Sequence, residues 1–208
     1  FNAFVLRYSV KPSVFPVALL EAADAMKMIR EHAAEWHVDP DAIAVIGFSA
    51  GGHLAANLAT STSDDVLVAH GYDPDAVRPN GLMLAYPVIT SGPLAHRGSF
   101  DSLLGERRND SQALESVSIE RHIDAKTPPV FVWHTIPDET VPYENTLMLI
   151  DACKKAGVSI EAHLFPQGGH GLSLGTAETA WQGVNGIEPS IQIWPQLAVS
   201  WMRRTFAR

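Results

Sequence analysis

The sequence has a single cysteine, Cys153, and no uninterrupted apolar run long enough to span a bilayer. One cysteine cannot form an intrachain disulfide or a multi-cysteine metal site, and without a long apolar run we expect no membrane-spanning helix. Basic residues are also scarce, since 15 Lys and Arg stand against 23 Asp and Glu, for a formal net charge of −8. A nucleic-acid partner needs a basic face, so this balance argues against one.

Three common cofactor motifs are missing as well. The chain contains no P-loop, no G-x-G-x-x-G and no H-E-x-x-H, so nothing indicates a nucleotide cofactor or a zinc ion. We therefore expect chemistry that needs neither a cofactor nor a metal. The 208 residues, 46% of them hydrophobic, provide enough apolar surface for one core, and we expect a single domain over residues 1–208.

Apolar, β-branched runs alternate with amphipathic stretches of helical length, which is typical of an α/β fold with a mainly parallel sheet. The predicted strands are Ala3–Ser9, Ala42–Gly47, Gly81–Ile89, Val130–Thr135 and Ile160–Phe165. The predicted helices are Val17–Trp36, an alanine-rich stretch reaching Thr60, Asn145–Ala156 and a C-terminal segment around Trp194–Met202. Two stretches, Ser91–Thr127 and Ser173–Pro189, are expected to be irregular, and loops of that length often shape a binding site.

The most informative segment is Gly47-Phe48-Ser49-Ala50-Gly51, which reads G-x-S-x-G between a predicted strand and a predicted helix. Small residues on both sides let the backbone turn sharply, so that the Ser49 hydroxyl projects clear of the sheet. The N-terminus of the following helix favours developing negative charge. We therefore predict Ser49 as a nucleophile, although an isolated G-x-S-x-G also occurs in incidental turns.

A serine hydroxyl needs a base, and that base needs an orienting acid. Glycines flank His170 just after the last predicted strand, in a tight loop that can carry an imidazole back over the sheet edge. Asp138 follows the preceding strand and is our candidate acid, with Glu139 as its rival. Taken alone, each could be an ordinary surface-loop residue, but the order Ser, acid, His is that of an α/β-hydrolase.

Three other reactive side chains have simpler interpretations. His53 follows the serine turn and is expected to pack within its helix. His134 lies at a strand end and is interpreted as structural or as a contact behind the site. Cys153 falls in a helix-like segment, and we interpret it as a small core residue rather than a reactive thiol.

The sequence resembles the α/β-hydrolase esterases grouped with acetyl-xylan esterases and feruloyl-esterase-like (BD-FAE type) enzymes. The resemblance covers most of the chain. It is carried by Val5–Val10, Asp39-Pro40 with Ile43–Ala55, Ser99-Phe100 with Leu103–Gly105, Thr127–Pro129 with His134-Thr135, Val141-Pro142 with Asn145, and Gly168–Gly171.

The resemblance implies a role for four residues. Ser49 is the expected nucleophile, His170 the base, Asp138 the orienting acid and the backbone N–H of Ala50 one oxyanion donor. Members of this family commonly remove acetyl or similar acyl groups from sugars without a cofactor. The implied partner is thus a small acyl ester, an acetylated sugar above all.

The resemblance is incomplete at the N-terminus. Family members carry an H-G-G-G-like loop whose backbone N–H groups complete the oxyanion hole, and this sequence lacks it. Phe1 falls about where the fourth strand of the family begins, so we expect a domain that is partial at its N-terminus. Without the third strand, Ala3–Ser9 and Ala42–Gly47 must pair directly, leave a gap or accept a strand from elsewhere. Such exposed strand edges favour a homo-oligomer.

Two function classes therefore stand at this point. The first is a serine esterase that acts through an acyl-serine, with a serine peptidase as the alternative among enzymes. The second is a non-catalytic hydrolase-like chain that only binds or assembles, which the missing oxyanion loop supports.

Overall fold

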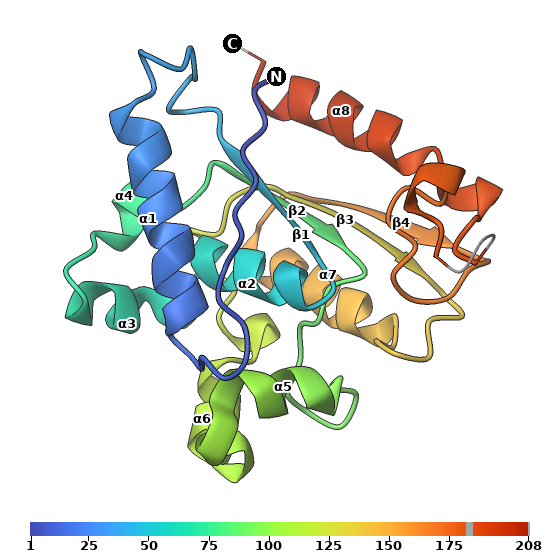
Figure 1. Cartoon of the computed structure of the whole chain (residues 1–208), viewed down its shortest axis with the longest axis horizontal. Coiled ribbons are helices and arrows are strands. Elements are labelled where there is room, and N and C mark those ends of the chain that lie inside the picture. Colours follow the sequence, from blue (N-terminus) through green and yellow to red (C-terminus); the bar gives the residue numbers. More distant parts are fainter. Residues whose placement is uncertain (182–184, 208) are drawn as a thin grey trace.

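The computed structural model describes residues 1–181 and 185–207. At its centre lies a four-stranded sheet in the order β1-β2-β3-β4 (Figure 1). Every neighbouring pair is parallel, with Ala44 beside Gly81, Leu82 beside Val130, and Val130 beside Ile160. This confirms the predicted α/β class. The strands are β1 (Ala44–Phe48), β2 (Gly81–Ala85), β3 (Val130–Thr135) and β4 (Ile160–Phe165).

Helices connect these strands and cover both faces of the sheet. They are α1 (Val17–Glu31), α2 (Ala50–Ala59), α3 (Asp64–Ala69), α4 (Pro74–Val77), α5 (Arg97–Leu104), α6 (Ser111–Ser116), α7 (Glu144–Ala156) and α8 (Trp194–Thr205). Short 3₁₀ turns occupy η1 (Ser61–Ser63), η2 (Gly105–Asn109), η3 (Ile119–Arg121), η4 (Ala177–Thr179) and η5 (Pro189–Ile191). Within the described residues, no helix combines the length and the apolar character that crossing a membrane requires.

The core forms because alternate residues of a buried strand point to opposite faces. On one face, Leu82 and Val132 pack with alanines of α2 and with Leu149 of α7. On the other, Phe131 and Trp133 pack against α8, which lies across the sheet from α2 and α7 (Figure 1). Burying each of these large side chains contributes about 1.5–3 kcal/mol.

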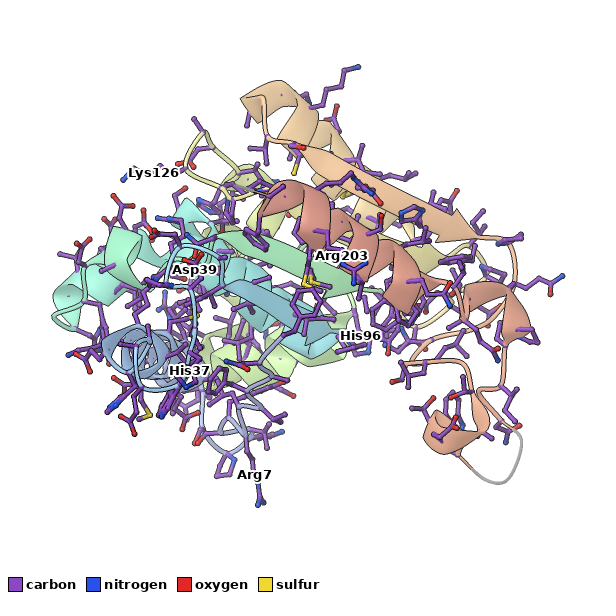
Figure 2. All side chains as sticks on the ribbon, turned by 90° about the horizontal axis from the view of Figure 1, so that it is seen from above. Arg7, His37, Asp39, His96, Lys126 and Arg203 are labelled. Carbon is purple, nitrogen blue, oxygen red and sulfur yellow. The ribbon has the colours of Figure 1, made fainter. Side chains whose placement is uncertain are left out.

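The C-terminal helix meets the sheet through residues at helical spacing. Trp194, Ala198 and Trp201 of α8 lie four and then three residues apart, so they share one face, and all three are buried. Arg203 of the same helix is labelled in Figure 2, which looks at the molecule from above. The predicted C-terminal helix is thus confirmed.

The predicted strand Ala3–Ser9 is wrong. These residues form no regular structure and run outside the sheet, past α1 and α2 (Figure 1), and Arg7 points away from the body of the molecule (Figure 2). A β-branched, apolar run becomes a strand only where it finds a ladder, and none of the described strands pairs with it. Side-chain hydrogen bonds hold it instead, from Asn2 to the Trp36 carbonyl and from Ser9 to Glu21.

The irregular stretch predicted for Ser91–Thr127 also needs correction, because it contains α5, η2, α6 and η3. A cap explains one of these short helices: the Asp110 side chain accepts hydrogen bonds from the N–H groups of Gln112 and Ala113. The other stretch, Ser173–Pro189, contains η4, and its residues 182–184 lie outside the described part.

Three predicted elements have other bounds than the pattern indicated. The strand Gly81–Ile89 ends at Ala85, because Tyr86 takes a positive φ of 39° and Pro87 cannot donate to a ladder. The helix predicted to Trp36 ends at Glu31. The strand predicted over Ala42–Gly47 runs instead from Ala44 to Phe48.

His53 of α2 packs in the interior, as expected. It is buried, its Nε2–H donates to the Val117 carbonyl at 2.8 Å, and its ring meets Phe100 edge-on at 5.3 Å. Burial lowers the pKa of His53 to about 4, and the hydrogen bond to Val117 only partly offsets this. The folded protein therefore holds a neutral imidazole over a pH range in which the unfolded chain takes up a proton.

We expect this histidine to make stability depend on pH. Because its pKa falls from 6.5 when unfolded to about 4 when folded, its contribution is present above pH 6.5 and is lost as the pH falls toward 4. The loss amounts to about 3 kcal/mol. Urea unfolding of the wild type and of His53→Gln at several pH values measures it.

The difference in unfolding free energy between wild type and His53→Gln should shrink steadily between pH 6.5 and pH 4. Phe100→Leu is the matched control, since it disturbs the same contact and removes no titratable group. It should lower stability by a similar amount at every pH. A constant difference between wild type and His53→Gln would contradict the assignment.

Candidate active site

Ser49 lies at a sharp turn between β1 and α2. Its φ is 53° and its ψ is −120°, a conformation that costs a non-glycine residue free energy and is retained where the surroundings enforce it. The backbone N–H of Ser49 donates to the Ala85 carbonyl, and its own carbonyl accepts from the N–H of Val88. These bonds to the end of β2 hold the serine side chain out at the carboxyl edge of the sheet.

The glycines around Ser49 are required by close backbone contacts. A Cβ on Gly47 would lie 2.2 Å from the carbonyl oxygen of Gly51, and a Cβ on Gly52 would lie 2.9 Å from Cβ of Pro87. Gly51 has more room, since the nearest atom to its added Cβ is the Tyr8 hydroxyl at 3.3 Å. The first and last glycines of this run thus allow the turn itself.

Three predicted residues meet in one chain of hydrogen bonds. The Ser49 hydroxyl lies 2.7 Å from Nε2 of His170, and Nδ1 of the same ring lies 2.6 Å from Oδ2 of Asp138. The residues are 121 and 32 positions apart in sequence. They meet because β1, β3 and β4 are parallel, so the loops after them share one edge of the sheet.

Asp138 is buried and hydrogen-bonded at both oxygens. Oδ1 accepts from the N–H groups of Thr140 and Val141, both at 2.9 Å, and Oδ2 accepts from His170 and His134. Burial opposes ionisation of this carboxyl, but the hydrogen bonds and the attraction of His170 outweigh it and hold the pKa of Asp138 well below its usual range. The rival carboxylate, Glu139, is exposed.

Glycines and aromatic contacts position the His170 loop. Gly168 and Gly171 have φ values of 100° and 77°, which other residues rarely adopt. The Thr135 hydroxyl donates to the Gly169 carbonyl at 3.1 Å and ties this loop to β3. The ring of Tyr86 meets that of His170 edge-on at 5.0 Å.

Sequence reasoning missed Tyr86. Besides its contact with His170, its hydroxyl accepts a hydrogen bond from the N–H of Ser173 at 3.1 Å. Burial raises its pKa, so the phenol stays neutral. Its position in the sequence could have indicated it, because Tyr86 directly follows an apolar strand and precedes a proline. This places it at the same edge of the sheet as Ser49.

Ala50 is the first residue of α2 and is exposed. The first N–H groups of a helix have no partner within it, and the Ala50 N–H is one of them. It belongs to the residue that follows Ser49 and lies at the positive end of the helix dipole. Such an N–H can donate to an oxygen that becomes negative on a group attached to Ser49. The residues described hold no cluster of three or more His, Cys, Asp or Glu side chains suited to a metal.

Cys153 lies on α7 and is buried in the protein core, as expected. Burial raises the pKa of its thiol to about 12. The sulfur is therefore a protonated core atom and no nucleophile.

The family model described as BD-FAE matches residues 4–152. The chain belongs to the BD-FAE family. The match confirms the resemblance read from the motifs, and it includes Ser49 and Asp138 but stops before His170.

Known structures agree with this assignment. The acetyl ester-xyloside bifunctional hydrolase of Caldicellulosiruptor lactoaceticus is 37% identical, with a TM-score of 0.80 over 95% of this chain and 69% of that one. An α/β hydrolase from a deep-sea metagenome library, MGS-M1, is 34% identical with a TM-score of 0.74, over 96% of this chain and 69% of that one. This BD-FAE member therefore has the α/β-hydrolase fold.

Two curated relatives of the BD-FAE chain are larger. Endo-1,4-beta-xylanase B of Butyrivibrio fibrisolvens is 33% identical over 88% of this chain and 29% of its own length. The acetylxylan esterase of Xylanibacter ruminicola is 28% identical over 83% of this chain and 35% of its own length. The chain thus spans about a third of these relatives, and the presence of an esterase among them agrees with the predicted enzyme class.

We expect Gly47→Ala to destabilise the BD-FAE chain by about 3 kcal/mol, because the added methyl group overlaps the Gly51 backbone and neither segment can retreat. Gly169→Ala is the matched control, since nothing lies within 4 Å of its added Cβ. Urea unfolding of both variants checks this. Equal midpoints for the two would show that the turn tolerates a side chain at position 47.

Proposed function

We propose that this chain is a serine esterase that hydrolyses a small acyl ester, an acetyl group on a carbohydrate, through an acyl-serine intermediate. The observation that carries the proposal is the hydrogen-bonded series of hydroxyl, imidazole and carboxylate, with spacings of 2.7 and 2.6 Å. Each group has the partner that its proposed role requires.

In the first half of the proposed reaction, the Ser49 oxygen attacks the ester carbonyl carbon while Nε2 of His170 takes the hydroxyl proton. The carbonyl oxygen becomes negative and is stabilised by the Ala50 N–H. The C–O bond to the sugar then breaks, and His170 returns the proton to the departing alcohol. Asp138 stays ionised throughout, which its low pKa favours, and it stabilises the imidazolium.

In the second half, a water molecule takes the place of the alcohol. His170 removes a proton from this water, the oxygen attacks the acyl carbon, and the bond to the Ser49 oxygen breaks as that oxygen regains its proton. Acetic acid and the free serine result. The reaction needs neither an oxidant nor a metal.

The acetylated carbohydrate is proposed from the relatives. One is named an acetylxylan esterase, and a structural neighbour is named an acetyl ester-xyloside bifunctional hydrolase. The names of the Butyrivibrio xylanase and of the Caldicellulosiruptor hydrolase also refer to glycoside hydrolysis, which commonly uses a pair of carboxyl groups. The carboxylate at this site, Asp138, already accepts four hydrogen bonds from the protein, so ester cleavage suits the site better.

We expect Ser49→Ala to reduce hydrolysis of p-nitrophenyl acetate by roughly 10⁴–10⁶-fold, because the attacking oxygen is gone. A fluorophosphonate probe should label the wild type at Ser49 and should not label the variant. Ser116→Ala is the matched control, as this serine lies on α6 and its hydroxyl donates to the Ala113 carbonyl of the same helix. A Ser49→Ala variant that hydrolyses the ester at the wild-type rate would contradict the mechanism. If the probe does not label Ser49 in the wild type, the result would favour a non-catalytic chain.

The substrate class has its own test. Acetylated xylo-oligosaccharides should release acetate with the wild type and none with Ser49→Ala, while the number of reducing ends stays constant because no glycosidic bond breaks. Acetate by enzymatic assay and reducing sugar by colorimetry give the two readings. New reducing ends without acetate would contradict ester hydrolysis at this site.

A further inference from the structure

The proposed mechanism does not use the buried imidazole that lies beside Asp138, that of His134. His134 lies at the end of β3 and is fully buried. Its Nε2 is 3.2 Å from Oδ2 of Asp138 and 3.0 Å from the Val141 carbonyl oxygen. Its Nδ1 is 2.8 Å from the hydroxyl of Thr146 on α7. Both ring nitrogens therefore have partners, on two different elements.

The contact with Val141 decides where a proton sits on this ring. A carbonyl oxygen accepts hydrogen bonds and never donates one, so Nε2 must carry the hydrogen. The same N–H then faces Asp138 Oδ2 and is shared between two acceptors. The Thr146 hydroxyl holds the ring from its other side and prevents it from turning.

Oδ2 is also the oxygen that accepts from His170, at 2.6 Å. The two histidines thus donate to the same oxygen of Asp138. A donor that withdraws charge from a carboxylate weakens the attraction of that carboxylate for its other partner. The geometry therefore links His134 to His170 although no contact between the two rings is needed.

We propose that His134 is a positioning residue, which fixes the Asp138 carboxylate and limits how strongly Oδ2 attracts the proton of His170. Too strong an attraction would leave His170 protonated at neutral pH and unable to accept the serine proton. The consequence for catalysis rests on the proposed esterase function, whereas the link between the two histidines does not.

The neighbours of the His170 ring show how a change at His134 can reach it. In the described part of the chain, its ring contacts Asp138, Ser49 and Tyr86. Tyr86 is a phenol whose pKa burial raises, and Glu139 on the Asp138 loop is exposed. A change in the titration of His170 after substitution of His134 would thus be transmitted through Asp138.

Two amide variants separate this role from simple packing. The side-chain nitrogen of His134→Gln reaches about as far as Nε2 and keeps a donor toward Asp138. His134→Asn is one carbon shorter and keeps only a polar group near Thr146. Both place an amide in the same buried space, so a loss of stability alone should affect them similarly.

The readout is the pKa of His170, followed by NMR on imidazole-labelled protein and assigned by the signal lost in His170→Asn. His134→Asn should raise this pKa by about 0.5–1 unit, because Oδ2 regains charge, and His134→Gln should leave it near the wild-type value. The acid limb of the kcat/KM profile for p-nitrophenyl acetate should move by the same amount. Equal pKa values in all three proteins, or equal shifts in both variants, would overturn the proposal.

A measurement on the wild type tests the same point without a substitution. The imidazole ¹⁵N signals of His134 should show hydrogen on Nε2, and a bare Nε2 would also overturn the proposal. Both NMR readings are independent of activity. A shifted His170 pKa in a protein that hydrolyses no ester would retain the link between the histidines and reject the esterase function.

Discussion

The arrangement of the site depends on hydrogen bonding to one buried carboxylate. Asp138 is enclosed by protein, where an unpartnered charge is strongly disfavoured. Two backbone N–H groups and two imidazoles donate hydrogen bonds to it. These bonds hold the Asp138 loop, the Nε2 side of the His134 ring and the orientation of His170. Removing any one donor leaves buried charge incompletely solvated, so these parts are stabilised as a unit.

A second constraint is steric and acts on the serine turn. Ser49 has a positive φ, and Gly47 and Gly52 let β1, α2 and the Ala85–Val88 segment approach within contact distance. The turn and the Asp138 network lie at the carboxyl edge of the same parallel sheet. Sheet register therefore positions the hydroxyl within 2.7 Å of the imidazole, at the sheet edge where open α/β folds bind their ligands.

Much of this could be predicted from local patterns. β3 and β4 match their predicted bounds. β3 lies inside the sheet and is buried throughout, as expected of a central parallel strand, whereas β4 lies at the sheet edge and combines partly buried with exposed residues. The segment Ala3–Ser9 has a similar composition and forms no strand, since composition cannot tell whether a partner ladder exists. The helices within Ser91–Thr127 were missed because short polar helices owe their stability to caps and tertiary contacts.

The sequence alone determined the fold class, the candidates Ser49, Asp138 and His170, and the family, because glycine turns and strand ends are encoded locally. Tertiary structure decided which carboxylate meets His170, selecting the buried Asp138 over the exposed Glu139. It also placed Tyr86 against His170 and His134 beside Asp138. Such contacts join segments that lie on different strands and loops, and their distances follow from sheet register and core packing.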